Sequence, residues 1–166
     1  MKIIKQMLMT VAVLLCSATV HAYDIEVDGI YYNIVSLTDL TIEVTYKGNS
    51  YDEISNEYSG EVIIPETVVY KSKVLKVTSI GDNAFGACYG LKKVVIPKSL
   101  TGIEQPYNTS SYMFDGCPNM VLYVVCGSYG YSYAQSRGLS YNVSHEKTVT
   151  ITPATCTRQG YTHYRC

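Results

Sequence analysis

Three side chains near the C-terminus have the chemistry of metal ligands. Cys156, His163 and Cys166 offer sulfur and nitrogen atoms on one short segment, whereas a structural zinc ion is held by four such ligands. The segment supplies three, and nine residues separate its two cysteines, which is not the spacing of a zinc finger. We therefore expect no metal site. In an oxidising compartment, Cys156 and Cys166 are a candidate disulfide or two free thiols.

The other side chains that could perform catalysis lack partners in the sequence. Asp52, Glu53 and Glu57 lie among Ser and Asn residues, as the acids of a solvated loop do. No G-x-S-x-G motif marks a nucleophilic serine, and the glycines of residues 81–90 do not form a phosphate-binding pattern. The sequence predicts a protein with no enzymatic activity and no cofactor. A hydrolase would require an acidic cleft that residue spacing does not reveal.

Composition favours a β-rich protein and argues against nucleic acid as a partner. The 166 residues include 13 Lys and Arg, 14 Asp and Glu, 17 Tyr and no Trp, with a formal net charge of −1. Nucleic-acid binders usually carry a basic patch, which this balance does not provide. Tyr is a strand former with an apolar ring and a polar tip, so its abundance indicates strands.

Residues 1–22 have the organisation of a secretory signal peptide. Lys2 and Lys5 precede a short apolar run, and small and polar residues lead to Ala22, after which we expect cleavage. The run is shorter than the roughly 20 residues that span a bilayer. The pattern predicts a secreted or cell-surface protein without a membrane span. A buried N-terminal helix and lipid attachment at Cys16 are the alternatives.

Turn and capping residues predict the elements around the centre of the chain. Alternating segments flank the dipeptide Asp28-Gly29, which suits a tight hairpin turn, and a second hairpin is expected across residues 71–73. Ser128 as N-cap and Gly138 as stop predict a helix over residues 128–137, followed by a strand at 139–143.

An internal repeat is the most informative feature of the sequence. The pattern I-x4-F-x2-C-x2-L-x2-V-x-I-P starts at Ile80 and returns from Ile103 at an interval of 23; an insertion within residues 104–113 then widens the interval to 29. Residues 62–65 match 94–97 at an interval of 32. Such periods are typical of solenoid coils that stack apolar side chains inward. The predicted repeat core comprises Ile80, Phe85, Cys88, Leu91, Val94, Ile96, Ile103, Phe114, Cys117 and Met120, and we expect Tyr123 and Val125 to continue it inward.

Cys88 and Cys117 occupy equivalent positions in successive coils. Stacking places equivalent residues about 4.8 Å apart with parallel side chains, whereas a disulfide prefers about 5.5–6 Å between Cα atoms and converging Cβ vectors. We predict that both cysteines stay reduced and pack as small apolar groups.

A resemblance to a known family rests on residues 80–100, which read IGDNAFGACYGLKKVVIPKSL. They resemble the BspA-like leucine-rich repeats of secreted proteins from Bacteroidetes, and the resemblance covers roughly residues 24–143. It implies a mainly β fold: a β-rich N-terminal cap and lead-in repeat (23–79), then a short leucine-rich-repeat-like solenoid of about two to three coils with a C-terminal closing helix (80–143). Residues 144–166 are a separate cysteine-bearing tail. Its residues 155–166 resemble the start of a small cysteine repeat, which suggests truncation after Cys166.

The family is linked to adhesion, so the resemblance implies a non-enzymatic surface that binds a host extracellular protein or another cell. Exposed tyrosines suit such contacts because they give a large area at a small entropic cost. A structural spacer or stalk and a glycan-binding accessory module are the alternatives. The predicted contact residues are Tyr107, Asn108, Tyr112, Tyr129 and Tyr131.

Overall fold

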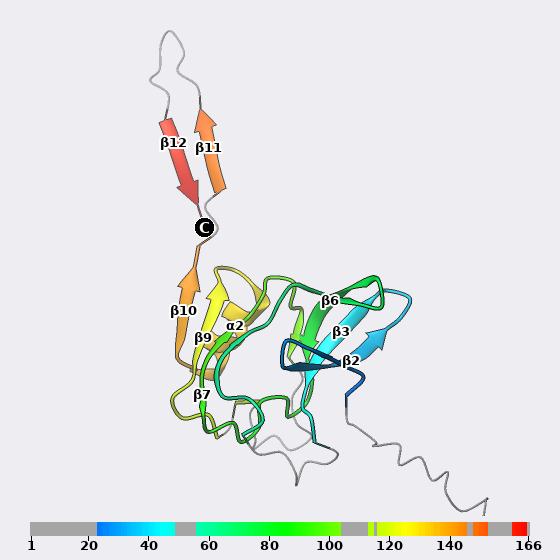
Figure 1. Cartoon of the computed structure of the whole chain (residues 1–166). Coiled ribbons are helices and arrows are strands. Elements are labelled where there is room, and N and C mark those ends of the chain that lie inside the picture. Colours follow the sequence, from blue (N-terminus) through cyan, green and yellow to red (C-terminus); the bar gives the residue numbers. More distant parts are fainter. Residues whose placement is uncertain are drawn as a thin grey trace, which may run out of the picture.

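The protein is mainly β, with two sheets, one helix and a separate hairpin in the part of the chain that the structure describes (Figure 1). The computed structural model describes residues 23–48, 56–103, 113–114, 116–145, 148–152 and 161–165, the last two segments by their backbone alone. The hairpin pairs β11 (Thr148–Thr152) with β12 (Tyr161–Arg165) in antiparallel register. It follows the second sheet at its β10 end.

The first sheet is built mostly from the N-terminal half of the chain. Its strands run in the order β1-β2-β3-β6-β5, and β8 also pairs with β6. The β3–β6 and β6–β8 pairs are parallel and the others antiparallel. The strands are β1 (Ile25–Val27), β2 (Ile30–Ser36), β3 (Thr41–Thr45), β5 (Thr67–Tyr70), β6 (Lys73–Ile80) and β8 (Gly102–Ile103).

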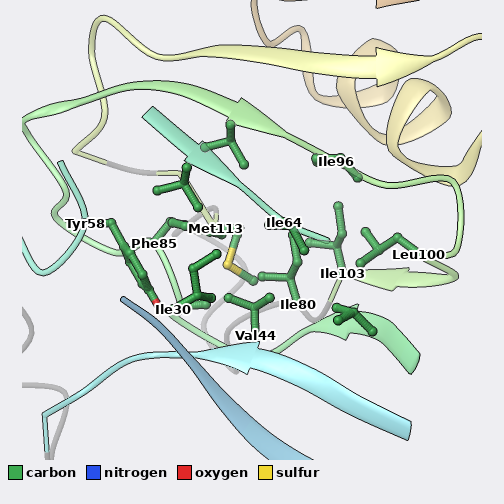
Figure 2. Packing of buried hydrophobic residues seen from close by; sticks show 14 of the residues in the cluster. Ile30, Val44, Tyr58, Ile64, Ile80, Phe85, Ile96, Leu100, Ile103 and Met113 are labelled. Carbon is green, nitrogen blue, oxygen red and sulfur yellow. The ribbon is translucent and has the colours of Figure 1, made fainter. Parts of the chain in front are cut away.

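The second sheet is parallel throughout. Its order is β10-β9-β7-β4, with β4 (Gly60–Ile63), β7 (Leu91–Val95), β9 (Val121–Val125) and β10 (Tyr141–Ser144). The core lies between the two sheets, with Ile30 and Val44 of the first sheet on one side and Ile64 and Ile96, at the ends of β4 and β7, on the other (Figure 2). A parallel sheet covered on one face is the arrangement that successive stacked coils produce.

The predicted hairpins and helix are confirmed. Val27 pairs with Ile30 across Asp28 and Gly29, both of which have positive φ angles of 52° and 76°. Tyr70 pairs with Lys73, so the second turn contains two residues rather than the expected three. Helix α2 (Tyr129–Arg137) begins where the Ser128 side chain accepts a hydrogen bond from the Tyr131 amide and ends at Gly138, whose φ is 64°.

Strand pairing follows most of the predicted repeat. Ile80 pairs with Ile103, and Val62 and Ile63 pair with Val94 and Val95, at the intervals found in the sequence. The ten predicted core residues are all buried, and the described cysteines Cys88, Cys117 and Cys126 are all free thiols.

The inward direction predicted for Tyr123 and Val125 is wrong. Leu122 and Val124 are the buried residues of β9, whereas Tyr123 is 38% exposed and Val125 is half-buried. The reason is a bulge in β7: Gly60 pairs with Leu91 but Glu61 pairs with Lys93, so Lys92 is an extra residue. Leu91 and Val94 therefore both point inward in β7. Strand β9 has no such extra residue. Its inward-pointing residues therefore come one position earlier than the interval of 29 predicts.

A line of aromatic rings crosses the core. This aromatic spine consists of Tyr23, Tyr31, Tyr58, Phe85, Phe114 and Tyr133, with successive centroids 4.7, 5.9, 5.0, 5.4 and 6.4 Å apart. Its four middle members, Tyr31, Tyr58, Phe85 and Phe114, recur along the chain at nearly equal intervals. Each such contact adds about 0.5–1.5 kcal/mol beyond area burial. The spine therefore ties the N-terminal sheet to the helix.

The hydroxyl group of Tyr58, which lies just before β4, is bonded to two strands of the first sheet. It donates to the Thr45 carbonyl at 2.6 Å and accepts from the Tyr31 amide at 3.1 Å. Burial raises its pKa above the ordinary value of 10.0. The ring is thus held in place by packing and by two hydrogen bonds.

Candidate functional site: the outer face of the parallel sheet

The outer face of the parallel sheet presents side chains from four strands in aligned rows. Alternation along a strand sends every second side chain away from the core. Pairing then places Ile63 beside Val95, Val95 beside Tyr123, and Tyr123 beside Asn142. Ile63 is 59% exposed and Tyr123 is 38% exposed. The row is mixed in character, with apolar, aromatic and amide groups.

A charged group lies across the same face. Lys93 Nζ is 2.5 Å from Glu61 Oε1 and 4.6 Å from the centroid of the Tyr123 ring. Contacts of these two kinds contribute about 0.2–1 kcal/mol each when exposed to solvent. Their main effect here is on geometry, because together they hold three side chains from three different strands in one arrangement. The outer face thus holds a preorganised Glu61–Lys93–Tyr123 group.

A second surface lies at the exposed side of α2. A hollow of about 510 Å³ opens between the helix and Ile103 and is lined by Ile103, Tyr129, Ser132, Tyr133, Ser136 and Arg137. The Arg137 guanidinium lies 5.8 Å from the centre of the Tyr133 ring. Tyr129 is 42% exposed there, so a predicted contact residue borders the hollow.

The Tyr131 side chain mainly contacts other residues of this protein. Its ring meets the Tyr141 ring edge-on at 5.7 Å, and its hydroxyl accepts a hydrogen bond from Gln135 Nε2 at 2.9 Å. The side chain is half-buried, which leaves less of it for a partner.

Other predicted site residues lie outside the described residues. These are Tyr107, Asn108 and Tyr112 of the insertion, and the candidate disulfide pair Cys156 and Cys166. Of the five predicted contact residues, the structure therefore describes Tyr129 and Tyr131. Neither lies on the outer face of the parallel sheet.

The described residues carry few groups with altered acid–base chemistry. Burial raises the pKa of the Cys88 thiol and of the Tyr32 hydroxyl, and a raised pKa makes a thiol less reactive. Among these residues, no cluster of three His, Cys, Asp or Glu side chains could hold a metal ion. None of the described helices has the length and apolar character required to cross a membrane.

The fold and the outer face define a mainly β protein with a repeat-built parallel sheet. No protein-family model and no curated protein matches the chain. Among solved structures, it is similar to a leucine-rich repeat protein from Bacteroides ovatus ATCC 8483, with 27% sequence identity and a TM-score of 0.46. The match covers 60% of this chain and 23% of that protein, so the chain spans under a quarter of its length.

Proposed function

We propose that the chain is a secreted or cell-surface leucine-rich repeat protein of the BspA-like kind, without enzymatic activity, that binds an extracellular host protein or another cell. The observation that carries the proposal is the preorganised Glu61–Lys93–Tyr123 group on the outer face of the parallel sheet. Aromatic and cationic side chains held in place before binding lose little entropy when a partner docks. The same face carries exposed Ile63, which adds apolar contact area.

The proposed architecture is a solenoid of two to three coils. Strands β4, β7 and β9 would each belong to one coil, the first sheet would cap the N-terminal end, and α2 would close the other. Support comes from the register of the parallel strands and from the matching intervals in the sequence. A rigid stack of this kind keeps its outer face constant while the partner approaches.

The proposed location outside the cell rests on residues 1–22. Their basic start, apolar run and Ala22 boundary have the pattern of a signal peptide. Tyr107, Asn108 and Tyr112, which lie outside the described residues, remain predicted contact residues together with Tyr129.

Binding of the purified chain to immobilised extracellular-matrix proteins and to a glycan array tests the proposal. We expect saturable binding to a protein that Tyr123→Ala or Lys93→Ala weakens about tenfold, the effect of losing a modest hot-spot residue. Tyr89→Ala is the matched control, because Tyr89 is 62% exposed but lies in the turn after Cys88.

The alternatives predict different results in the same experiment. Binding confined to glycans would favour an accessory module. A folded chain that binds nothing would favour a spacer, and equal losses in the Tyr89 and Tyr123 variants would exclude the outer sheet face as the contact surface.

A further inference from the structure

Strand β4 leaves one edge of the parallel sheet open. It is the last strand in the order β10-β9-β7-β4. The Gly60 amide donates to the Gly90 carbonyl and the Ile64 amide to the Val95 carbonyl, so alternate residues of the segment face β7. Glu61 and Ile63 lie between them and direct their N–H and C=O groups to the other side. Within the described part of the chain, no hydrogen bond reaches those backbone groups.

Two adjoining hollows follow this open edge. One of about 410 Å³ lies beside Glu57–Val62, and one of about 340 Å³ lies beside Ile63, Pro65 and β5. Both are lined by Asp28, Ile30 and Ile63, so they are parts of one groove between β4 and the β1–β2 turn. The groove leaves space beside β4 for a second backbone, which would supply hydrogen-bond partners for the outward N–H and C=O groups of β4.

One end of the groove is apolar. Ile63 is 59% exposed and Val69 is 66% exposed, and both line the smaller hollow. Val69 pairs directly with Val74, which is 56% exposed. Ile63 and Val69 thus border one hollow and Val74 lies beside Val69, whereas exposed aliphatic residues usually occur singly.

The other end of the groove is acidic. Asp28, Glu57 and Glu61 line the larger hollow, which no Lys or Arg lines. Glu61 is paired with Lys93 on the outer face, and the Glu57 carboxylate accepts the Lys47 and Gly48 amides. Asp28 is exposed in the β1–β2 turn. Among the described residues, an ion pair therefore neutralises one of the three carboxylates and leaves two negative charges. This end of the groove favours a positively charged group.

We propose that an extended peptide docks along β4 as an added parallel strand, with basic residues at its amino end and β-branched apolar residues after them. Parallel addition continues the direction of all four strands and lets the peptide backbone pair with Glu61 and Ile63. It places the amino end of the peptide beside Glu57, which lines only the larger hollow, and its apolar side chains beside Val69, which lines only the smaller one. This inference rests on the proposed binding function and adds to the outer face a second contact region, the β4 edge, with one class of partner.

Fluorescence anisotropy with the full chain and a labelled peptide, Lys-Lys-Val-Thr-Val-Thr-Val, tests the proposal. We expect saturable binding that is at least about fivefold weaker for Glu-Glu-Val-Thr-Val-Thr-Val and for the peptide of reversed order, because both lose the charge match. Ile63→Pro should abolish binding, since it removes an outward N–H while leaving the β7 hydrogen bonds in place. Asp28→Asn should weaken it, because Asn removes the charge and keeps the positive φ of the turn.

The controls separate docking from folding and from the broader function. Leu37→Lys changes a side chain that is 63% exposed away from the groove and should leave binding unchanged. Circular dichroism verifies that Ile63→Pro is folded, and Asp28→Asn provides the test if it is not. Tyr123→Ala should keep peptide binding while it weakens binding to the extracellular protein, so the two proposals can fail separately.

Three results would overturn the inference. Equal binding of the basic and acidic peptides would remove the charge argument, and stronger binding of the reversed peptide would exclude parallel addition. A chain that sediments as a dimer, and becomes a monomer in the Ile63→Pro variant, would show that a second copy fills the groove.

Discussion

Replacement of Gly130 by Ala should destabilise the protein, although Ala is the better helix former. In the interior of a helix, Gly→Ala contributes about 0.5–1 kcal/mol of stability. At Gly130 the added methyl group would lie 2.8 Å from Ile96 Cγ2 and 3.4 Å from Val124 Cγ1. Carbon atoms prefer separations of about 3.5–4.0 Å. The Ile96 side chain is 1% exposed and branched at Cβ, so it has little freedom to move.

The expected change is a loss of about 1–2 kcal/mol in the free energy of unfolding, because overpacking of a core costs about 1–3 kcal/mol and exceeds the helix-propensity gain. The melting temperature should fall by about 3–8 °C for a domain of this size. Because the chain has no Trp, far-UV circular dichroism in urea is the suitable measurement. Gly102→Ala is the matched control, since its methyl group would lie at an ordinary 3.6 Å from Ser79 Cβ, and it should be neutral or slightly stabilising.

A double-mutant cycle tests the cause of the loss. Ile96→Leu removes the Cγ2 methyl group and by itself should cost less than about 1.5 kcal/mol. In that background, Gly130→Ala should be close to neutral, which gives a coupling energy of about 1–2 kcal/mol. If Gly130→Ala is as stable as the unmodified chain, or if its effect is the same in both backgrounds, the close approach of helix and sheet is not what requires glycine.

Two further predictions concern buried polar groups. The Tyr58 hydroxyl keeps its proton in the folded state at pH values where the unfolded chain loses it, so its contribution to stability is complete below about pH 10 and falls as the pH rises further. Tyr58→Phe should cost about 1–3 kcal/mol at neutral pH by leaving the Thr45 carbonyl without its donor, and should flatten the decline in alkaline urea titrations; an unchanged decline would contradict this assignment. Iodoacetamide labelling followed by peptide mass spectrometry should modify half-buried Cys126 in the native protein and buried Cys88 and Cys117 only in denaturant; native-state labelling of Cys88 as fast as that of Cys126 would exclude a closed core.

Local signals predicted the elements of the fold well because each rests on neighbouring residues. Asp28 and Gly29 supply the positive φ angles of a hairpin turn, and Ser128 and Gly138 cap the helix. The interval between residues 62–65 and 94–97 gave the register of β4 on β7. The bulge at Lys92 has no local signal of this kind, because an extra residue in one strand is defined only by its neighbours in space. That is why Tyr123 was assigned to the wrong face.

The candidate site was harder to find from the sequence. The abundance of tyrosine pointed to Tyr129, which borders a hollow, and to Tyr131, which packs on Tyr141. The Glu61–Lys93 pair was missed although its interval along the chain equals that of the flanking Val62 and Val94. Applying the repeat interval to polar positions as well as apolar ones would have found this pair. The open edge of β4 depends on which strands have no neighbour, which residue spacing does not reveal.

The regular spacing of the aromatic spine has a consequence for how the chain folds. From Tyr31 to Phe114, each ring contact closes a loop of nearly the same length. The entropy lost on closing a loop depends on the logarithm of its length, so these steps cost nearly the same. No step has to wait for a distant segment. As the chain emerges N-terminus first, each new ring finds the preceding one already in place, so the aromatic spine can form in the order in which its residues are made.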